Sequence, residues 1–184
     1  NWKLVGHLPE PLAYGVTVTC DNSMIVVGGM NNDGSYGKVY RVTLVDGKAE
    51  VSTLPSMPCS VDNMAGALVG KHLYIAGGAM DGKASNRVLR LDLDNISAGW
   101  KDIKSFPGMV RVQPVAGSMG DNRFCLFGGF APAANGEEAK LSMDGCVYDE
   151  TTDEWELVEG PKDDQGEPLF VGGGIGINLT KDQL

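Results

Sequence analysis

Three stretches, MIVVGG at 24–29, LYIAGG at 73–78 and FCLFGG at 124–129, share one pattern, an apolar run that ends in two glycines. Their first glycines stand at positions 28, 77 and 128, so the pattern recurs about every 50 residues. A repeat of that length built from short strands is typical of the blade of a β-propeller. A glycine-rich phosphate loop would require a helix directly after the glycines. The segments that follow here have no helical apolar period and no GK[ST] motif, so we set that alternative aside.

Each repeat predicts four strands, A to D, around the double glycine. Strand A is rich in alanine, glycine and valine, which suits an innermost strand crowded near an axis. Strand B is the continuously apolar run, as expected for a strand buried on both faces. Strand C is expected at 38–44, 87–93 and 145–150, and strand D at 2–9, 51–55, 100–107 and 155–161. Trp2, Trp100 and Trp155 in strands D are expected to fill the wedge between neighbouring blades.

The whole chain, residues 1–184, is therefore predicted to be one all-β propeller fragment. Complete repeats are expected at approximately 10–58, 59–108 and 109–161, with partial blades at 1–9 and 168–184. Propellers need roughly four to eight blades, so three complete blades cannot close a ring. Open terminal blades would expose apolar faces and strand edges. We expect a second polypeptide segment or a further chain to supply the remaining blades.

Charge and composition exclude several classes of partner. The formal net charge is −9 and the basic residues form no cluster, which argues against nucleic acid and anionic membrane surfaces. No apolar stretch reaches the roughly 18 residues of a membrane helix. Cys20, Cys59, Cys125 and Cys146 form no CxxC pair and are read as buried small hydrophobes, with their redox state left open. We predict neither a metal site nor a cofactor.

The face that carries the D–A and B–C connections is the expected binding face, because those loops are longer and more varied. Alignment on the double glycines places four residues at the start of successive strands A: Tyr14, Asn63, Gln113 and Phe170. Asp62 and Asn31 are further candidates for hydrogen bonding. Arg111 lies two residues before Gln113 and is either an anion clamp or a bridge between blades through backbone carbonyls. His7 is the candidate acid–base group.

The segment WKLVGHLPEPLAYGVTVTCDNSMIVVGG at 2–29 resembles the bacterial N-acetylneuraminate epimerases, or cyclically permuted mutarotases, of the kelch-repeat class. The tail LFVGGGIGINL at 169–179 is similar to a blade start of that family. The resemblance implies a six-bladed propeller, periplasmic or secreted, that interconverts the anomers of sialic acid, a small anionic sugar, without metal or cofactor. Where the family carries arginine and glutamate, this chain has Leu12 and His7. His7 and Arg111 are therefore the catalytic candidates that remain.

Two other functions stay open at this stage. One is a non-catalytic kelch module that binds peptides or carbohydrates on the same face, because the fold alone does not decide function. The other is a kelch-type copper-radical oxidase, for which Tyr14 and His7 would be too few ligands.

Overall fold

The computed structural model describes residues 1–134 and 136–176, and in this part of the chain the regular elements are strands and one short 3-10 helix, η1 (Ile96–Ala98). The strands form three four-stranded antiparallel sheets. The first sheet holds β1 (Val16–Cys20), β2 (Ser23–Val27), β5 (Val39–Val45) and β6 (Lys48–Leu54). The second holds β8 (Ala65–Val69), β9 (His72–Ala76), β12 (Val88–Asp92) and β13 (Trp100–Ile103). The third holds β14 (Val115–Met119), β15 (Arg123–Phe127), β18 (Asp144–Asp149) and β19 (Glu154–Glu159).

Short hairpins extend the connection between the second and third strand of each sheet. They are β3 (Met30–Asn31) with β4 (Gly34–Ser35), β10 (Ala79–Met80) with β11 (Lys83–Ala84), and β16 (Phe130–Ala131) with β17 (Lys140–Leu141). A further strand, β7 (Val61–Asp62), pairs with β10. No helix in the described residues is long and apolar enough to cross a membrane.

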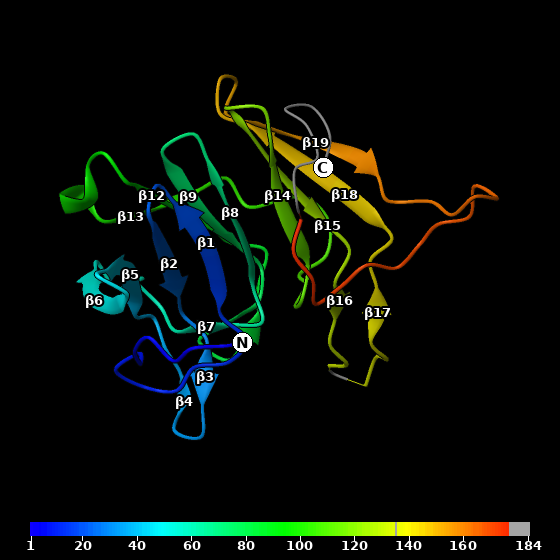
Figure 1. Ribbon diagram of the computed structural model, residues 1–184. Coiled ribbons are helices and arrows are strands. Elements are labelled where there is room, and N and C mark those ends of the chain that lie inside the picture. The colour runs from blue at the N-terminus through cyan, green and yellow to red at the C-terminus, as the bar shows by residue number, and fades with distance from the viewer. Residues whose placement is uncertain (135, 177–184) are drawn as a thin grey trace.

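The three sheets stand side by side with their first strands innermost (Figure 1). Strand β8 packs against β1 on one side and β14 on the other, whereas β6, β13 and β19 form the outer edges. This arrangement confirms the predicted all-β, kelch-type propeller fold, with strands A next to the axis.

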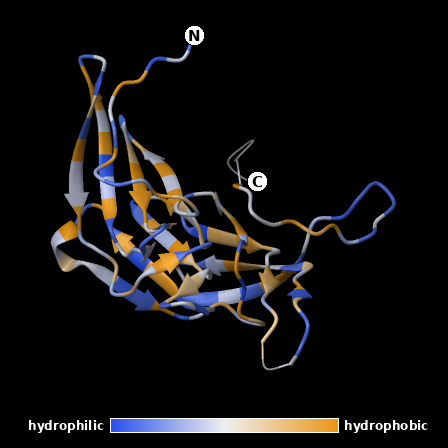
Figure 2. Cartoon of the chain, turned by 90° about the horizontal axis from the view of Figure 1, so that it is seen from below, coloured by the Kyte–Doolittle hydropathy of each residue, from blue (hydrophilic) through white to orange (hydrophobic). Residues whose placement is uncertain are grey.

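The core fills the two gaps between neighbouring sheets. Along β9, Leu73 and Ile75 face the first sheet while Tyr74 and Ala76 face the third, and all four are 0% exposed. Alternate side chains thus serve different interfaces, which explains why strand B is apolar at every position. Figure 2 shows the hydrophobic residues concentrated on the strands. Each fully buried large side chain contributes about 1.5–3 kcal/mol.

Two of the three predicted tryptophan wedges are confirmed. Trp100 donates its Nε1–H to the Pro55 carbonyl of the preceding sheet at 2.8 Å, and Trp155 donates to the Lys104 carbonyl at 2.9 Å. Each indole packs against the core between those sheets. Trp2 does not pack in this way and is fully exposed.

The structure assigns no strand to residues 2–9, which were expected to form a strand D. The segment runs beside the outer strand β6 instead, where the Val5 carbonyl accepts a 2.8 Å hydrogen bond from the Ala49 amide. Among the described residues, no preceding sheet offers Trp2 a face to pack on. The predictions for residues 177–184, the end of a strand A and the start of its turn, lie outside the described residues.

Candidate functional site

A ladder of backbone hydrogen bonds joins the inner ends of the sheets. The Asn63 amide donates to the Tyr14 carbonyl at 2.9 Å, Gln113 donates to Asn63 at 2.7 Å, and Gly173 donates to Gln113 at 2.9 Å. All four residues have positive φ angles, 58°, 52°, 52° and 65° in chain order. This left-handed conformation is uncommon for residues other than glycine and often marks functional sites. We call Tyr14, Asn63, Gln113 and Gly173 the axial ladder.

The double glycines supply a second set of links between repeats. The amide of the second glycine in each pair donates to a carbonyl two residues before the next ladder residue, in the pairs Gly29–Val61 (2.8 Å), Gly78–Arg111 (2.9 Å) and Gly129–Val171 (2.9 Å). A Cβ on Gly78 would stand 2.5 Å from the Asp62 carbonyl oxygen. Only glycine permits this close approach, which accounts for the motif that defines the repeat.

The structure places Tyr14, Asn63 and Gln113 at the equivalent inner positions that the sequence predicted. Phe170 does not take the fourth position. Gly173 stands there, three residues further along, while Phe170 is 42% exposed and lines an adjoining apolar hollow with Val171. The error arose because FVGGGIG offers several glycines and no following double glycine from which to count.

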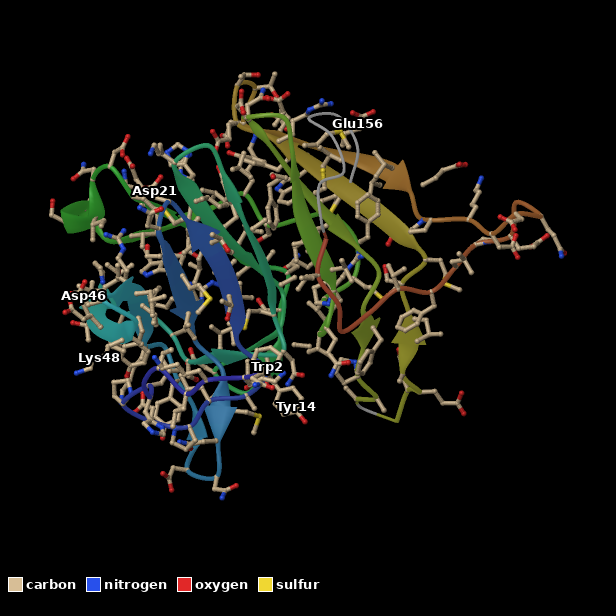
Figure 3. The ribbon with its side chains drawn as sticks, in the orientation of Figure 1. Trp2, Tyr14, Asp21, Asp46, Lys48 and Glu156 are labelled. Atoms are coloured by element: carbon tan, nitrogen blue, oxygen red, sulfur yellow. The ribbon has the colours of Figure 1, made fainter. Side chains whose placement is uncertain are left out.

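The axial ladder borders a cavity of about 530 Å³. In Figure 3, Tyr14 lies at the opposite end of the first sheet from Asp21, a residue of the turn between β1 and β2. The cavity therefore opens on the predicted face. The part of its lining that the structure describes carries no formal charge and combines an aromatic ring, two carboxamides and apolar groups: Tyr14, Gly15, Asn63, Met64, Gln113, Pro114, Gly173, Gly174 and Ile175. Such a surface suits the part of a ligand that is polar but carries no charge.

A chain of side-chain hydrogen bonds runs behind this lining. Asp62 is only 6% exposed, and its carboxylate accepts hydrogen bonds from Ser35 Oγ and from Asn63 Nδ2, the latter at 2.6 Å. Asn63 Oδ1 in turn accepts from Gln113 Nε2 at 3.0 Å. We call Ser35, Asp62, Asn63 and Gln113 the axial relay. It joins side chains from three successive repeats, which no single stretch of sequence could reveal.

Asn31 belongs to a second groove of about 570 Å³, between the N-terminal segment and the β3–β4 hairpin. Its Oδ1 accepts from the Tyr36 hydroxyl at 3.1 Å, which stabilises the hairpin. Glu10 lines the same groove and accepts from Lys38 Nζ and the Tyr40 hydroxyl, both at 2.6 Å. These bonds lower the pKa of Glu10, while burial and the Glu10 hydrogen bond raise the pKa of Tyr40 to about 12.

Arg111 lies in the wall between the second and third sheets and is 0% exposed. Its Nη1 donates to the Gly128 carbonyl at 3.1 Å, to Ser142 Oγ at 2.6 Å and to Asp144 Oδ1 at 3.1 Å. The guanidinium also lies 5.2 Å from the centre of the Phe106 ring. Of the two interpretations left open, the structure matches the bridge between blades.

His7 is exposed on the N-terminal segment and is not part of the cavity lining. The structure thus brings Tyr14, Asn63, Gln113 and Asp62 together and leaves His7, Arg111, Asn31 and Phe170 outside that group. Gly173 and Ser35 are the members that sequence reasoning missed. Among the described residues, no group of three His, Cys, Asp or Glu side chains is placed to hold a metal ion.

The fold and repeat define a kelch-type propeller protein. More particularly, the chain belongs to the N-acetylneuraminate epimerase family, whose sequence profile matches residues 54–166. It is similar to an N-acetylneuraminate epimerase of Haemophilus influenzae (strain PittEE), at 29% identity over 140 residues that cover 71% of this chain and 36% of the relative.

Two further relatives show the same partial coverage. A Kelch domain-containing protein of Vibrio cholerae is 31% identical over 106 residues, 58% of this chain and 28% of the relative. An N-acetylneuraminate epimerase of Yersinia enterocolitica is 31% identical over 111 residues, 60% of this chain and 27% of the relative. The matches thus span about a third of the length of these curated relatives or less.

Proposed function

We propose that the chain is part of a kelch protein that binds a sialic-acid-type sugar over the axial cavity and interconverts its anomers. One observation carries the proposal. In a chain of the epimerase family, three successive repeats deliver Tyr14, Asn63 and Gln113 to the rim of one cavity. Carboxamides suit sugar hydroxyls, and the Tyr14 ring, which is 61% exposed, offers a surface for the apolar face of a pyranose.

Mutarotation requires two coordinated proton transfers. A base removes the proton of the anomeric hydroxyl while an acid protonates the ring oxygen, so that the ring C–O bond breaks and the carbonyl forms. Reclosure on the other carbonyl face and the reverse proton transfers give the second anomer. Among the described lining residues, Tyr14 alone has a titratable side chain, so we assign one transfer to its hydroxyl. His7 lies outside this lining, so the second group would come from elsewhere in the complete protein, and Asn63 and Gln113 would position the sugar.

The test follows anomer equilibration by NMR after pure α-anomer is mixed with the complete polypeptide. We expect equilibration faster than in buffer, and roughly 10²-fold or greater loss of the enzymatic rate in Tyr14→Phe, the usual scale for general acid–base catalysis. Tyr36→Phe is the matched control, because Tyr36 lies in the second groove. Equilibration no faster than in buffer would reject the epimerase proposal.

A non-catalytic carbohydrate-binding module is the second candidate. Two observations favour it. The Arg111 guanidinium donates its hydrogen bonds to groups of the protein itself, and the described lining offers one titratable side chain where mutarotation needs two proton-transfer groups. This candidate predicts that the sugar perturbs the NMR signals of the protein while the anomers equilibrate at the rate seen in buffer.

We also propose that further blades cover the outer face of the first sheet. Met24 and Leu44 are 45% and 61% exposed there, and with Val5 and Ala49 they line an apolar hollow of about 350 Å³. Exposed apolar faces of this kind typically mark contacts with other protein. A periplasmic or secreted location is proposed from the family resemblance, and cell fractionation with an antibody against the chain would test it.

A further inference from the structure

We infer that Gln113 sets the specificity of the axial cavity by presenting its Oε1 as a hydrogen-bond acceptor to a hydroxyl or N–H group on an uncharged face of the sugar. The identity of the sugar rests on the proposed function above. The acceptor role itself follows from the axial relay, one hydrogen bond at a time.

The buried carboxylate of Asp62 fixes the orientation of Asn63. An ionised carboxylate only accepts hydrogen bonds, so the atom of Asn63 that lies 2.6 Å from Asp62 must be the donor Nδ2. Ser35 Oγ donates to the other carboxylate oxygen and holds it in place. The Asn63 carboxamide therefore turns its Oδ1 away from Asp62.

The orientation of Asn63 then decides that of Gln113. Asn63 Oδ1 is an acceptor, so the atom of Gln113 at 3.0 Å must be Nε2, and Oε1 is the outward-facing atom of this carboxamide. Oε1 lies 3.6 Å from where a Cβ on Gly173 would stand, and both residues line the cavity. No donor of the described residues contacts Oε1.

The charge around this acceptor selects its ligand. The described lining supplies no cation, and the negative charge of Asp62 lies behind Asn63. A sugar carboxylate placed here would face the acceptor Oε1 and the nearby negative charge of Asp62, and no donor would pair with it. That placement is unfavourable. A sugar hydroxyl or amide N–H would satisfy Oε1, whereas an analogue that lacks the donor would leave a desolvated acceptor unpaired.

The test uses the complete polypeptide and two sugars, N-acetylneuraminate and its C1 methyl ester, with dissociation constants measured by NMR titration. We expect Gln113→Met, which keeps the chain length but removes the acceptor, to raise Kd about tenfold for both sugars, the usual effect of one lost hydrogen bond. Asp62→Ala should raise Kd severalfold by releasing the relay. Asp62→Asn is the matched control, because its Oδ1 can still accept from Asn63 while its Nδ2 donates to Ser35, and Kd should stay within about twofold.

Each alternative outcome decides a separate point. A Gln113→Met penalty seen with the free acid but absent with the ester would show that Gln113 contacts the carboxylate, which overturns the inference. Equal losses in Asp62→Asn and Asp62→Ala would overturn the relay, since charge rather than orientation would then matter. If Asp62→Ala fails to fold, Gln113→Met still decides the acceptor role.

A neutral sugar, N-acetylmannosamine, distinguishes failure of the proposed function from failure of the acceptor role of Gln113. If neither sialic acid form binds but this sugar does, with the same Gln113→Met penalty, the proposed substrate fails and the acceptor role stands. Binding of all three sugars unchanged by Gln113→Met, or no binding of any of them, would overturn it.

Discussion

Replacing Arg111 with alanine should destabilise the fold without changing the sugar affinity of the molecules that remain folded. The Arg111 guanidinium is fully buried and donates to the Gly128 carbonyl and Ser142 Oγ. Hydrogen bonds from a charged donor contribute about 1.5–3 kcal/mol each. The Asp144 side chain is 47% exposed, so its ion pair adds about 1 kcal/mol or less. The cost of desolvating the guanidinium subtracts from this gain. We therefore expect Arg111→Ala to lower the free energy of unfolding by about 3–5 kcal/mol.

Urea denaturation followed by circular dichroism measures that change, provided that unfolding is two-state. Asp144→Asn is the matched control and should cost about 1 kcal/mol or less, because water can solvate the half-exposed side chain. Sugar affinity, measured well below the denaturation midpoint, should match that of the unsubstituted protein. The reasoning is refuted if Arg111→Ala leaves stability unchanged within about 0.5 kcal/mol while sugar affinity falls, since Arg111 would then act on the ligand.

Three further perturbations test other parts of the structure. The hydrogen bond from Lys38 lowers the pKa of Glu10, so the ionised Glu10 side chain stabilises the fold above the ordinary carboxyl pKa. This stabilisation is lost as pH falls through the lowered pKa. The thermal unfolding midpoint should therefore fall in acid, and Glu10→Gln should flatten the acid part of the plot of midpoint against pH. Burial raises the pKa of Cys125 to about 11 and that of Cys146 to about 12; at pH 8 the native thiols should alkylate about a hundredfold or more slower than a free cysteine, and labelling at the free rate would show that both are open to solvent. Trp155→Phe removes an indole hydrogen bond and part of a buried ring, so it should cost about 1–3 kcal/mol in urea denaturation, whereas a change under about 0.5 kcal/mol would mean that this wedge adds little.

The sequence predicted those parts of the fold and site that recur at nearly the same distance from each double glycine, which for the ladder residues is 14, 14 and 15 residues. Strands A and B and the ladder positions Tyr14, Asn63 and Gln113 follow from counting back from the double glycines, because each repeat reuses the same backbone hydrogen bonds. The count failed at Phe170, where the connection is longer and several glycines compete for the position. Trp100 and Trp155 stand 23 and 27 residues after the first glycine of their repeats, so they were placed by the local pattern of strand D, a tryptophan followed by a proline six or seven residues later.

Features that depend on side chains from distant segments could not be predicted. The burial of Arg111 requires Phe106 from one repeat and Ser142 from the next, and sequence alone does not show that these converge. Trp2 has the same local sequence pattern as the other two tryptophans, yet it is exposed because packing requires a neighbouring face. The axial relay was missed for a similar reason, since Ser35 lies 27 residues from Asp62 in the chain.

The backbone ladder near the axis also bears on how related proteins could change ligands. Its hydrogen bonds join main-chain atoms, so they hold neighbouring sheets at a fixed spacing whatever side chains the ladder residues carry. Tyrosine, asparagine, glutamine and glycine already occupy the four positions with nearly the same φ angle. A substitution at one of them would therefore alter the chemistry offered to a ligand while the scaffold keeps its geometry, so these positions are natural starting points for evolving or engineering new selectivity.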